Sequence, residues 1–400
     1  MTEGVGGSTG EQELAQLEPP LRRASPITAA EYAARLDRAR ALMSGIGADA
    51  LLVGAGASLR YFAGVPWGAS ERLVCLVLPK HGRPVIVCPA FELGSLRASL
   101  AVDDAIVEVW EEDEDPYRVA ALAAREAGSK LALDPGATFA VFSGLRRAGQ
   151  GVEILDGAPV IDGCRRIKSA AELALMSEAK AITLEAHRRV ARILAPGIRA
   201  SEARRFIDAA HRALGADGGS TFCAVQFGEA TAYPHGLPDD QALGEGDLVL
   251  IDTGCQIQGY NADITRTYVF GQPTDEQRRI WDIEHQAQAA AFAAVRPGVA
   301  CEAVDRAARD ILERHGLGPD YRLPGLPHRT GHGIGLSVHE APYLVRGDRT
   351  PLQQGMCFSN EPMIVMPGRF GIRLEDHFHV TEDGAAWFTE PSPSIDAPFG

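Results

Sequence analysis

The sequence predicts two domains, an α/β domain followed by a larger α+β domain. Strand-like and helix-like segments alternate between residues 25 and 160, which is typical of an α/β layer. Between residues 161 and 400, helical segments flank two apolar hairpins that carry acidic residues. The 400 residues are long enough to bury two substantial cores.

The first domain is expected to follow a short tail. Residues 1–24 are rich in Gly, Glu and Pro and lack apolar periodicity, so we expect a mobile tail. Thr28-Ala-Ala-Glu31 is a capping-box pattern that predicts the start of a helix. Further strands are expected at residues 49–53, 73–78, 84–88 and 130–133, and a helix at residues 119–127.

The domain boundary is expected within residues 156–169, where Gly157, Pro159 and Gly163 interrupt regular structure. We therefore divide the chain into residues 25–160 and 161–400. A second capping box, Ser169-Ala-Ala-Glu172, predicts a long helix reaching about residue 194. Further helices are expected at residues 201–214, 274–295 and 301–315.

Composition excludes several classes of function. The formal net charge is −14, whereas nucleic-acid binding needs clustered Lys and Arg. The seven cysteines are odd in number and form no CxxC pair, which fits a reducing cytosol. The first residues lack the pattern of a signal peptide, and no apolar stretch is long enough to span a bilayer. We expect a cytoplasmic protein without a membrane or nucleic-acid partner.

Two pairs of acidic residues stand in similar hairpin contexts. A hairpin centred between Ile257 and Gln258 would place Asp252 directly opposite Asp263. A second hairpin, with its turn at Pro367-Gly368, would place Glu361 opposite Glu375. A slip of one residue in either register would turn one acid to the wrong face.

These four acids and His332 predict a site for two divalent metal ions. His332 lies in Gly331-His-Gly-Ile-Gly335, where glycines allow close approach of the backbone. Two adjacent cations need shared carboxylates, and an imidazole often completes the ligand set. The alternative is that these are four ordinary solvated acids. Their apolar, β-branched neighbours argue against that, because an unpaired buried charge costs several kcal/mol.

The ordered motifs resemble those of the pita-bread metallopeptidases, in the branch with prolidase (Xaa-Pro dipeptidase) and Xaa-Pro aminopeptidase. More narrowly, the chain resembles short bacterial Xaa-Pro dipeptidases. The resemblance runs from about residue 25 onward. It implies a pita-bread (creatinase/aminopeptidase-like) catalytic domain after a creatinase-type N-terminal domain. The matching segments are Ile251-Asp-Thr-Gly, Ala262-Asp-Ile-Thr-Arg-Thr, Gly331-His-Gly-Ile-Gly-Leu-Ser-Val-His-Glu340, Phe358-Ser-Asn-Glu-Pro362 and Ile372-Arg-Leu-Glu-Asp376.

The resemblance assigns a role to each ligand. Asp252 would chelate one metal, Asp263 and Glu375 would bridge both, and His332 and Glu361 would complete the second. The ions would be Mn²⁺, Zn²⁺ or Co²⁺. A hydroxide bridging the metals would attack the scissile carbonyl, with Glu361 as general base.

Other residues are candidates for substrate binding or catalysis. His235 and His339 would stabilise the reaction intermediate or hold substrate, as their family counterparts do. Arg373 could hold Glu361 or Asp263, meet the substrate carboxylate, or form a plain structural ion pair. His328 and Arg346 are further candidates, although packing is the better explanation of the first and solvation of the second. Val365 stands where aminopeptidase-type relatives often carry a proton-relaying tyrosine, so that relay needs another group or is dispensable.

The leading hypothesis is a prolidase that hydrolyses Xaa-Pro dipeptides. The family also implies a homodimer, with the first domain supporting dimerisation and walling off the active site of the neighbouring subunit. Alternatives are an Xaa-Pro aminopeptidase for longer peptides, a relative acting on a non-peptide substrate such as ectoine or a sulfonium compound, and a non-catalytic binding module.

Overall fold

A computed structural model describes residues 2–400, which form two compact units. One unit is Pro26–Arg165, and the other combines residues 2–25 with Arg166–Gly400. Both units combine helices with sheets, as the sequence predicts for an α/β domain followed by an α+β domain. Among residues 2–400, we find no helix long and apolar enough to cross a membrane.

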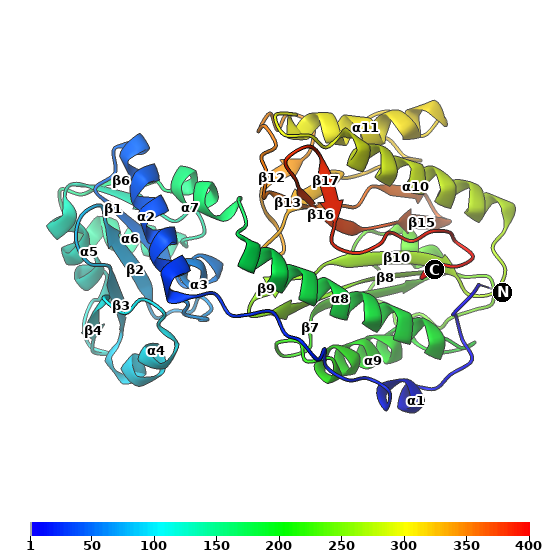
Figure 1. The fold of residues 1–400 in the computed structure, drawn as a ribbon, viewed down its shortest axis with the longest axis horizontal. Helices are drawn as coiled ribbons and strands as arrows, with labels where there is room; N and C mark the ends of the chain where they lie inside the picture. The colour runs from blue at the N-terminus through cyan, green and yellow to red at the C-terminus, as the bar shows by residue number, and fades with distance from the viewer. Residues whose placement is uncertain (1) are drawn as a thin grey trace. The chain divides into compact units, whose positions relative to one another are not determined.

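The smaller unit is built around a six-stranded mixed sheet with the order β4-β3-β2-β1-β5-β6 (Figure 1). Strand β1 runs parallel to β5 and antiparallel to β2. The elements are α2 (Ala29–Ile46), β1 (Ala50–Gly54), α3 (Ala57–Ala63), β2 (Cys75–Pro79), β3 (Val85–Pro89), η1 (Ala90–Glu92), α4 (Leu93–Ser99), β4 (Ile106–Trp110), α5 (Pro116–Ala127), β5 (Lys130–Leu133), α6 (Phe139–Ala148), β6 (Glu153–Asp156) and α7 (Ala158–Arg165).

The larger unit contains three sheets, with orders β10-β8-β7, β12-β11-β13-β16-β17 and β14-β15. In Figure 1, α8 and α9 lie along one side of these sheets and α10 and α11 along the other. The elements are α1 (Gly10–Leu14), α8 (Ala170–Ile193), α9 (Ala200–Ala213), β7 (Ser220–Phe227), η2 (Gly228–Ala232), β8 (Leu248–Ile257), β9 (Tyr260–Asn261), β10 (Ile264–Val269), α10 (Asp275–Ala294), α11 (Cys301–Arg314), β11 (Gly331–Gly333), β12 (Glu340–Leu344), β13 (Cys357–Asn360), β14 (Met363–Met366), β15 (Phe370–Arg373), β16 (Asp376–Val380) and β17 (Ala385–Trp387).

Both capping signals occur at helix starts. The Thr28 side chain accepts a hydrogen bond from the Glu31 amide at the start of α2. At the start of α8, Ser169 and Glu172 form a reciprocal capping box. The segment expected to break structure between the domains is instead helix α7, with Pro159 in its first turn, where proline costs no hydrogen bond.

The N-terminal segment differs from the expected mobile tail. The Thr2 hydroxyl donates to the carbonyl of Val269 at 2.7 Å. In α1, the carboxylate of Glu13 is buried and pairs with Arg189 of α8 at 3.0 Å. Composition misled here, because a glutamate that looks solvated in the sequence is paired with an arginine far along the chain.

At Gly254, strand β8 lies very close to the chain that leads into β10, and a substitution at this position tests that contact. A Cβ atom at this position would lie 1.9 Å from the carbonyl oxygen of Ala262, so backbone must move. We expect Gly254→Ala to lower the free energy of unfolding by about 1–3 kcal/mol, measured by urea denaturation. Gly45→Ala is the control, because its Cβ would meet nothing within 4 Å and alanine is the better helix former. An equally stable Gly254→Ala protein would contradict this account.

Candidate metal centre

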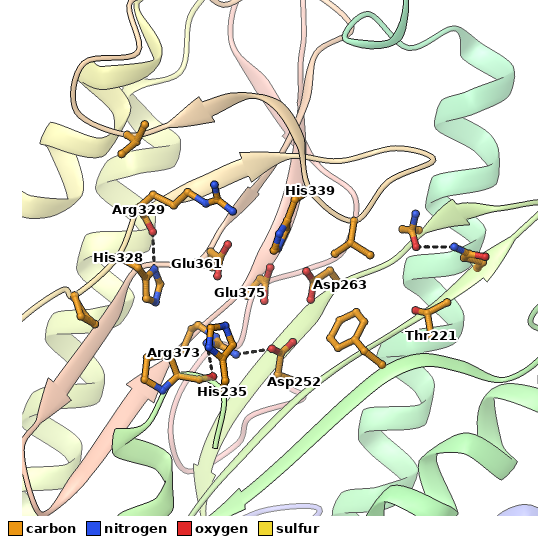
Figure 2. A pocket seen from close by; sticks show the side chains of 17 residues that line it. Thr221, His235, Asp252, Asp263, His328, Arg329, His339, Glu361, Arg373 and Glu375 are labelled. Atoms are coloured by element: carbon orange, nitrogen blue, oxygen red, sulfur yellow. Dashed lines mark hydrogen bonds and ion pairs between the residues drawn. The ribbon is translucent and has the colours of Figure 1, made fainter. Parts of the chain in front are cut away.

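The five predicted ligands lie in the larger unit, where separate elements bring them together. Asp252 lies on β8, Asp263 directly precedes β10 and His332 lies on β11. Glu361 directly follows β13, and Glu375 lies between β15 and β16. The four acids line one pocket of about 830 Å³, with their carboxylates facing a common space (Figure 2).

The register of the first hairpin differs from the predicted one. The turn is at Gln258-Gly259, so Ile257 pairs with Tyr260 and Asp252 pairs with Thr265 rather than Asp263. The turn centre moves by one residue, which shifts the pairing by two. Because side chains alternate with a period of two, both acids still face the same side. The predicted register was therefore wrong, whereas the prediction that both acids face the same side of the hairpin was right.

The register of the second hairpin is the predicted one. Met363 pairs with Arg373 on β14 and β15, and Asn360 pairs with Asp376 on β13 and β16. Both pairs are centred on Gly368, where φ is +68°. Glu361 and Glu375 lie between these pairs, at positions that the same register makes opposite.

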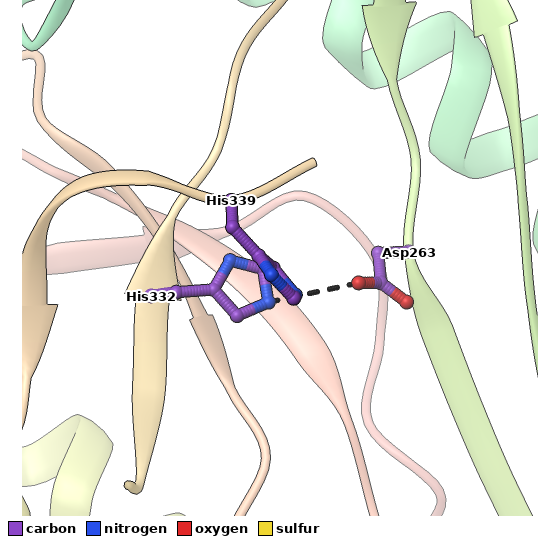
Figure 3. Close-up of side chains that lie close together, drawn as sticks. All are labelled: Asp263, His332 and His339. Carbon is purple, nitrogen blue, oxygen red and sulfur yellow. Dashed lines mark ion pairs between the residues drawn. The ribbon is translucent and has the colours of Figure 1, made fainter. Parts of the chain in front are cut away.

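His332 presents one ring nitrogen to the carboxylates. Its Nδ1 lies 3.0 Å from the carbonyl oxygen of Gly333, which places the proton on Nδ1 in the neutral ring. Its Nε2 lies 3.2 Å from Glu361 and 3.6 Å from Asp263 (Figure 3), without a well-directed hydrogen bond to either. A histidine that ligates a metal typically has this arrangement.

The charges in the cluster are poorly balanced without a cation. Burial raises the pKa of Glu375 well above its usual range, and repulsion from Asp263 and Glu361 adds to the effect. Burial also raises the pKa of Asp252, although Arg373 opposes this. Burial alone would lower the pKa of His332, but Asp263 and Glu361 outweigh it and raise the pKa to about 9.

Several of the converging atoms have no hydrogen-bond partner among residues 2–400. They are buried oxygens and a ring nitrogen, which divalent cations accept as ligands. They are Oδ1 of Asp252, Oδ1 of Asp263, Oε1 of Glu375 and Nε2 of His332. Orphaned buried acceptors are costly, so this donor set fits bound metal ions.

Arg373 contacts a different acid from those the sequence suggested. Its Nη2 donates to Oδ2 of Asp252 at 2.5 Å, and its Nε donates to the Thr265 hydroxyl at 3.0 Å. That hydroxyl donates to Oε2 of Glu375 at 2.7 Å. Arg373 is buried and therefore holds Asp252 directly and Glu375 through Thr265.

The predicted histidines line the same pocket. His235 and His339 are exposed at its surface, and the His339 ring packs edge-on against His332 with centroids 4.1 Å apart. His328 is partly buried, its Nδ1 lies 2.7 Å from the Arg329 carbonyl oxygen, and its Nε2 has no partner among the described residues. Val365 is buried in the core and is not part of the pocket lining.

Arg346 lies outside the pocket lining. Its guanidinium forms an ion pair with Asp320 and lies over the ring of Tyr321, and 60% of its side chain is exposed. The structure therefore does not bring Arg346 together with the other candidates.

Sequence reasoning missed three residues of the site. Thr265 links Arg373 to Glu375, and Ser359 accepts from the His332 amide and donates to Glu361. Arg329 lines the pocket with its guanidinium 4.4 Å from the ring centroid of Tyr343. Thr265 and Ser359 lie within recognised motifs, whereas only the fold brings Arg329 to the site.

Comparison with known proteins identifies the family. Residues 174–382 match metallopeptidase family M24, and residues 35–167 match the creatinase/prolidase N-terminal domain. The chain belongs to metallopeptidase family M24. Family M24 membership makes it a hydrolase and implies divalent metal ions.

Related M24 proteins align with almost the whole chain. The probable dipeptidase PepE of Mycobacterium tuberculosis (strain ATCC 25618 / H37Rv) is 39% identical over 359 residues, covering 88% of this chain and 93% of that protein. The Xaa-Pro dipeptidase of Lactobacillus helveticus is 32% identical over 344 residues, covering 84% and 92%. The structure of prolidase from Thermococcus sibiricus superposes with a TM-score of 0.82 at 31% identity, covering 90% and 97%.

The pKa of His332 predicts a pH-dependent stability of the metal-free protein. The folded pKa is about 9 against an ordinary value of 6.5, so the stabilisation is complete below pH 6.5 and is lost as the pH rises towards 9. We expect the difference in unfolding free energy between wild type and His332→Gln to shrink over this window. Urea denaturation in the presence of a chelator measures it. A difference that is constant with pH would contradict the assignment.

Proposed function

We propose that this M24 enzyme is a metal-dependent Xaa-Pro dipeptidase. The observation that carries the proposal is the convergence of four carboxylates and His332 Nε2, several of whose facing atoms lack partners. Asp252, Asp263, His332, Glu361 and Glu375 would hold two divalent cations, which fits Mn²⁺, Zn²⁺ or Co²⁺. The relatives named dipeptidase and Xaa-Pro dipeptidase support the choice of substrate.

Two divalent cations bound here would supply Lewis acidity and lower the pKa of a water molecule. Glu361 would serve as the base that takes the proton and passes it to the leaving nitrogen. Although burial acts in the opposite direction, contact with His332 holds the pKa of Glu361 well below its usual range, so the carboxylate is ionised and able to accept. The Ser359 hydroxyl donates to its Oε1 at 3.1 Å and orients it.

His235 and His339 would contact the substrate as it reacts. Both line the pocket, and the ring of His339 packs against His332 beside the carboxylates. Donors placed at developing negative charge are often the largest catalytic contribution. A neutral imidazole provides one such donor without adding charge to the site.

A dipeptide also needs a partner for its free carboxylate. Arg373 is already engaged by Asp252, and Arg346 is engaged by Asp320 outside the pocket. Arg329 lines the pocket and makes no ion pair among the described residues, so it replaces Arg346 as the candidate, together with His235. A guanidinium can bind a carboxylate through two parallel hydrogen bonds.

The length preference is tested with Ala-Pro and Ala-Pro-Ala on Mn²⁺-loaded protein. We expect cleavage of Ala-Pro, and a loss of at least about 100-fold in kcat for Glu361→Gln, because the base is removed. Glu382→Gln is the matched control, since Glu382 is exposed and does not line the pocket. Preferential cleavage of Ala-Pro-Ala would indicate an aminopeptidase, and cleavage of neither would indicate a non-peptide substrate or a binding role.

We expect substitutions of Arg329 and Arg346 to have different effects on substrate binding. We expect Arg329→Ala to raise KM for Ala-Pro by roughly 10–100-fold, because a charged hydrogen bond is worth about 1.5–3 kcal/mol. Arg346→Ala removes the same charge outside the pocket and should leave KM unchanged. Steady-state kinetics measures both, and equal effects of the two substitutions would exclude this assignment.

A further inference from the structure

His377 lies next to the cluster but was not among the predicted site residues. It follows Glu375 by two positions at β16, so the two side chains share one face of the chain. Its partner across the ladder is Ser359, which accepts from the His332 amide at 2.9 Å and donates to Glu361 at 3.1 Å. His377 thus borders the residues that hold the proposed ligands.

The His377 imidazole is completely buried, and neither ring nitrogen has a hydrogen-bond partner among residues 2–400. Its Nε2 lies 3.7 Å from Oε1 of Glu375, which also lacks a partner. The other oxygen of Glu375 accepts from the Thr265 hydroxyl. A shift of roughly 0.8 Å would bring Nε2 and Oε1 to an ordinary hydrogen-bond distance and satisfy both atoms.

Comparing His377 with His332 distinguishes a histidine that binds a metal from one that donates a hydrogen bond. A ligating histidine usually donates its other ring N–H to an acceptor, as Nδ1 of His332 does to the Gly333 carbonyl oxygen. No described acceptor lies in reach of Nδ1 of His377. A neutral imidazole carries one N–H, which either ring nitrogen can hold. Nothing holds that proton at Nδ1, whereas Glu375 faces Nε2.

We propose that His377 is a positioning residue whose Nε2–H donates to Oε1 of Glu375. With Thr265 on the other oxygen, it fixes the carboxylate that would bridge the two cations. The inference rests on the proposed metal centre and adds a residue outside the five-ligand set. Glu375 is held from two strands, by Thr265 of β10 and by His377 of β16.

Mn²⁺ binding to metal-free protein tests this role without any reading of activity. The electron paramagnetic resonance signal of free Mn²⁺ gives the dissociation constant directly. We expect His377→Leu to bind Mn²⁺ about 10–100-fold more weakly than wild type, which is the usual effect of losing an outer hydrogen bond. His377→Gln should bind close to wild type, because its amide can donate from a position near that of Nε2. His379→Leu removes the next histidine of β16, which packs on Phe388, and should leave binding unchanged.

The outcomes separate this inference from the proposed function. Wild type that binds no Mn²⁺ would overturn both. Wild-type affinity in His377→Leu, or equal weakening in His377→Gln and His377→Leu, would overturn the positioning role alone. Pulsed resonance spectra with two ligating imidazoles in wild type and one in His377→Leu would make His377 a ligand instead. Should the leucine variant not fold, His377→Asn replaces it, since its shorter amide does not reach Glu375.

Discussion

The mutual repulsion of four clustered carboxylates is the constraint on which the site depends. Asp263 and Glu375 are buried, Asp252 and Glu361 are partly buried, and Arg373 is the one arginine that pairs with any of them in the described structure. Removing such charges from water is costly unless cations compensate. Without metal, protons provide the compensation, as the raised pKa values of Asp252, Glu375 and His332 indicate. Metal binding should therefore release protons.

A buried ion pair next to the carboxylates holds the backbone in place against this repulsion. Arg266 of β10 donates to both oxygens of Asp376, and one of its nitrogens also donates to the Glu375 carbonyl oxygen. This buried pair joins the first acid-bearing hairpin to the second. The Gln288 side chain on α10 donates to Asp376 as well. The proposed ligands therefore lie on backbone whose position is set by contacts that a metal would not provide, which is the condition for a preorganised site.

Local signals predicted much of the fold and the five converging residues. Capping at Thr28 and Ser169 marked two helix starts, and Gly368 marked the turn that sets the second register. The first turn was misplaced because Gln258 adopts a positive φ of 50° beside Gly259, which residue type alone does not indicate. The error preserved the face because it shifted the pairing by an even number, so Asp252 and Asp263 still lie on the same side despite the wrong register.

The roles of the arginines and of His377 depend on contacts that no local pattern contains. Arg373, Arg346 and Arg329 look alike in the sequence, and each differs only in the acid it meets: Asp252, Asp320 or none among the described residues. Those acids lie 121 and 26 positions away from their arginines. A histidine likewise becomes a ligand or a donor according to what its second nitrogen meets. Sequence spacing predicts which residues lie near a site. The function of each residue there follows from which of its polar atoms still lack a partner.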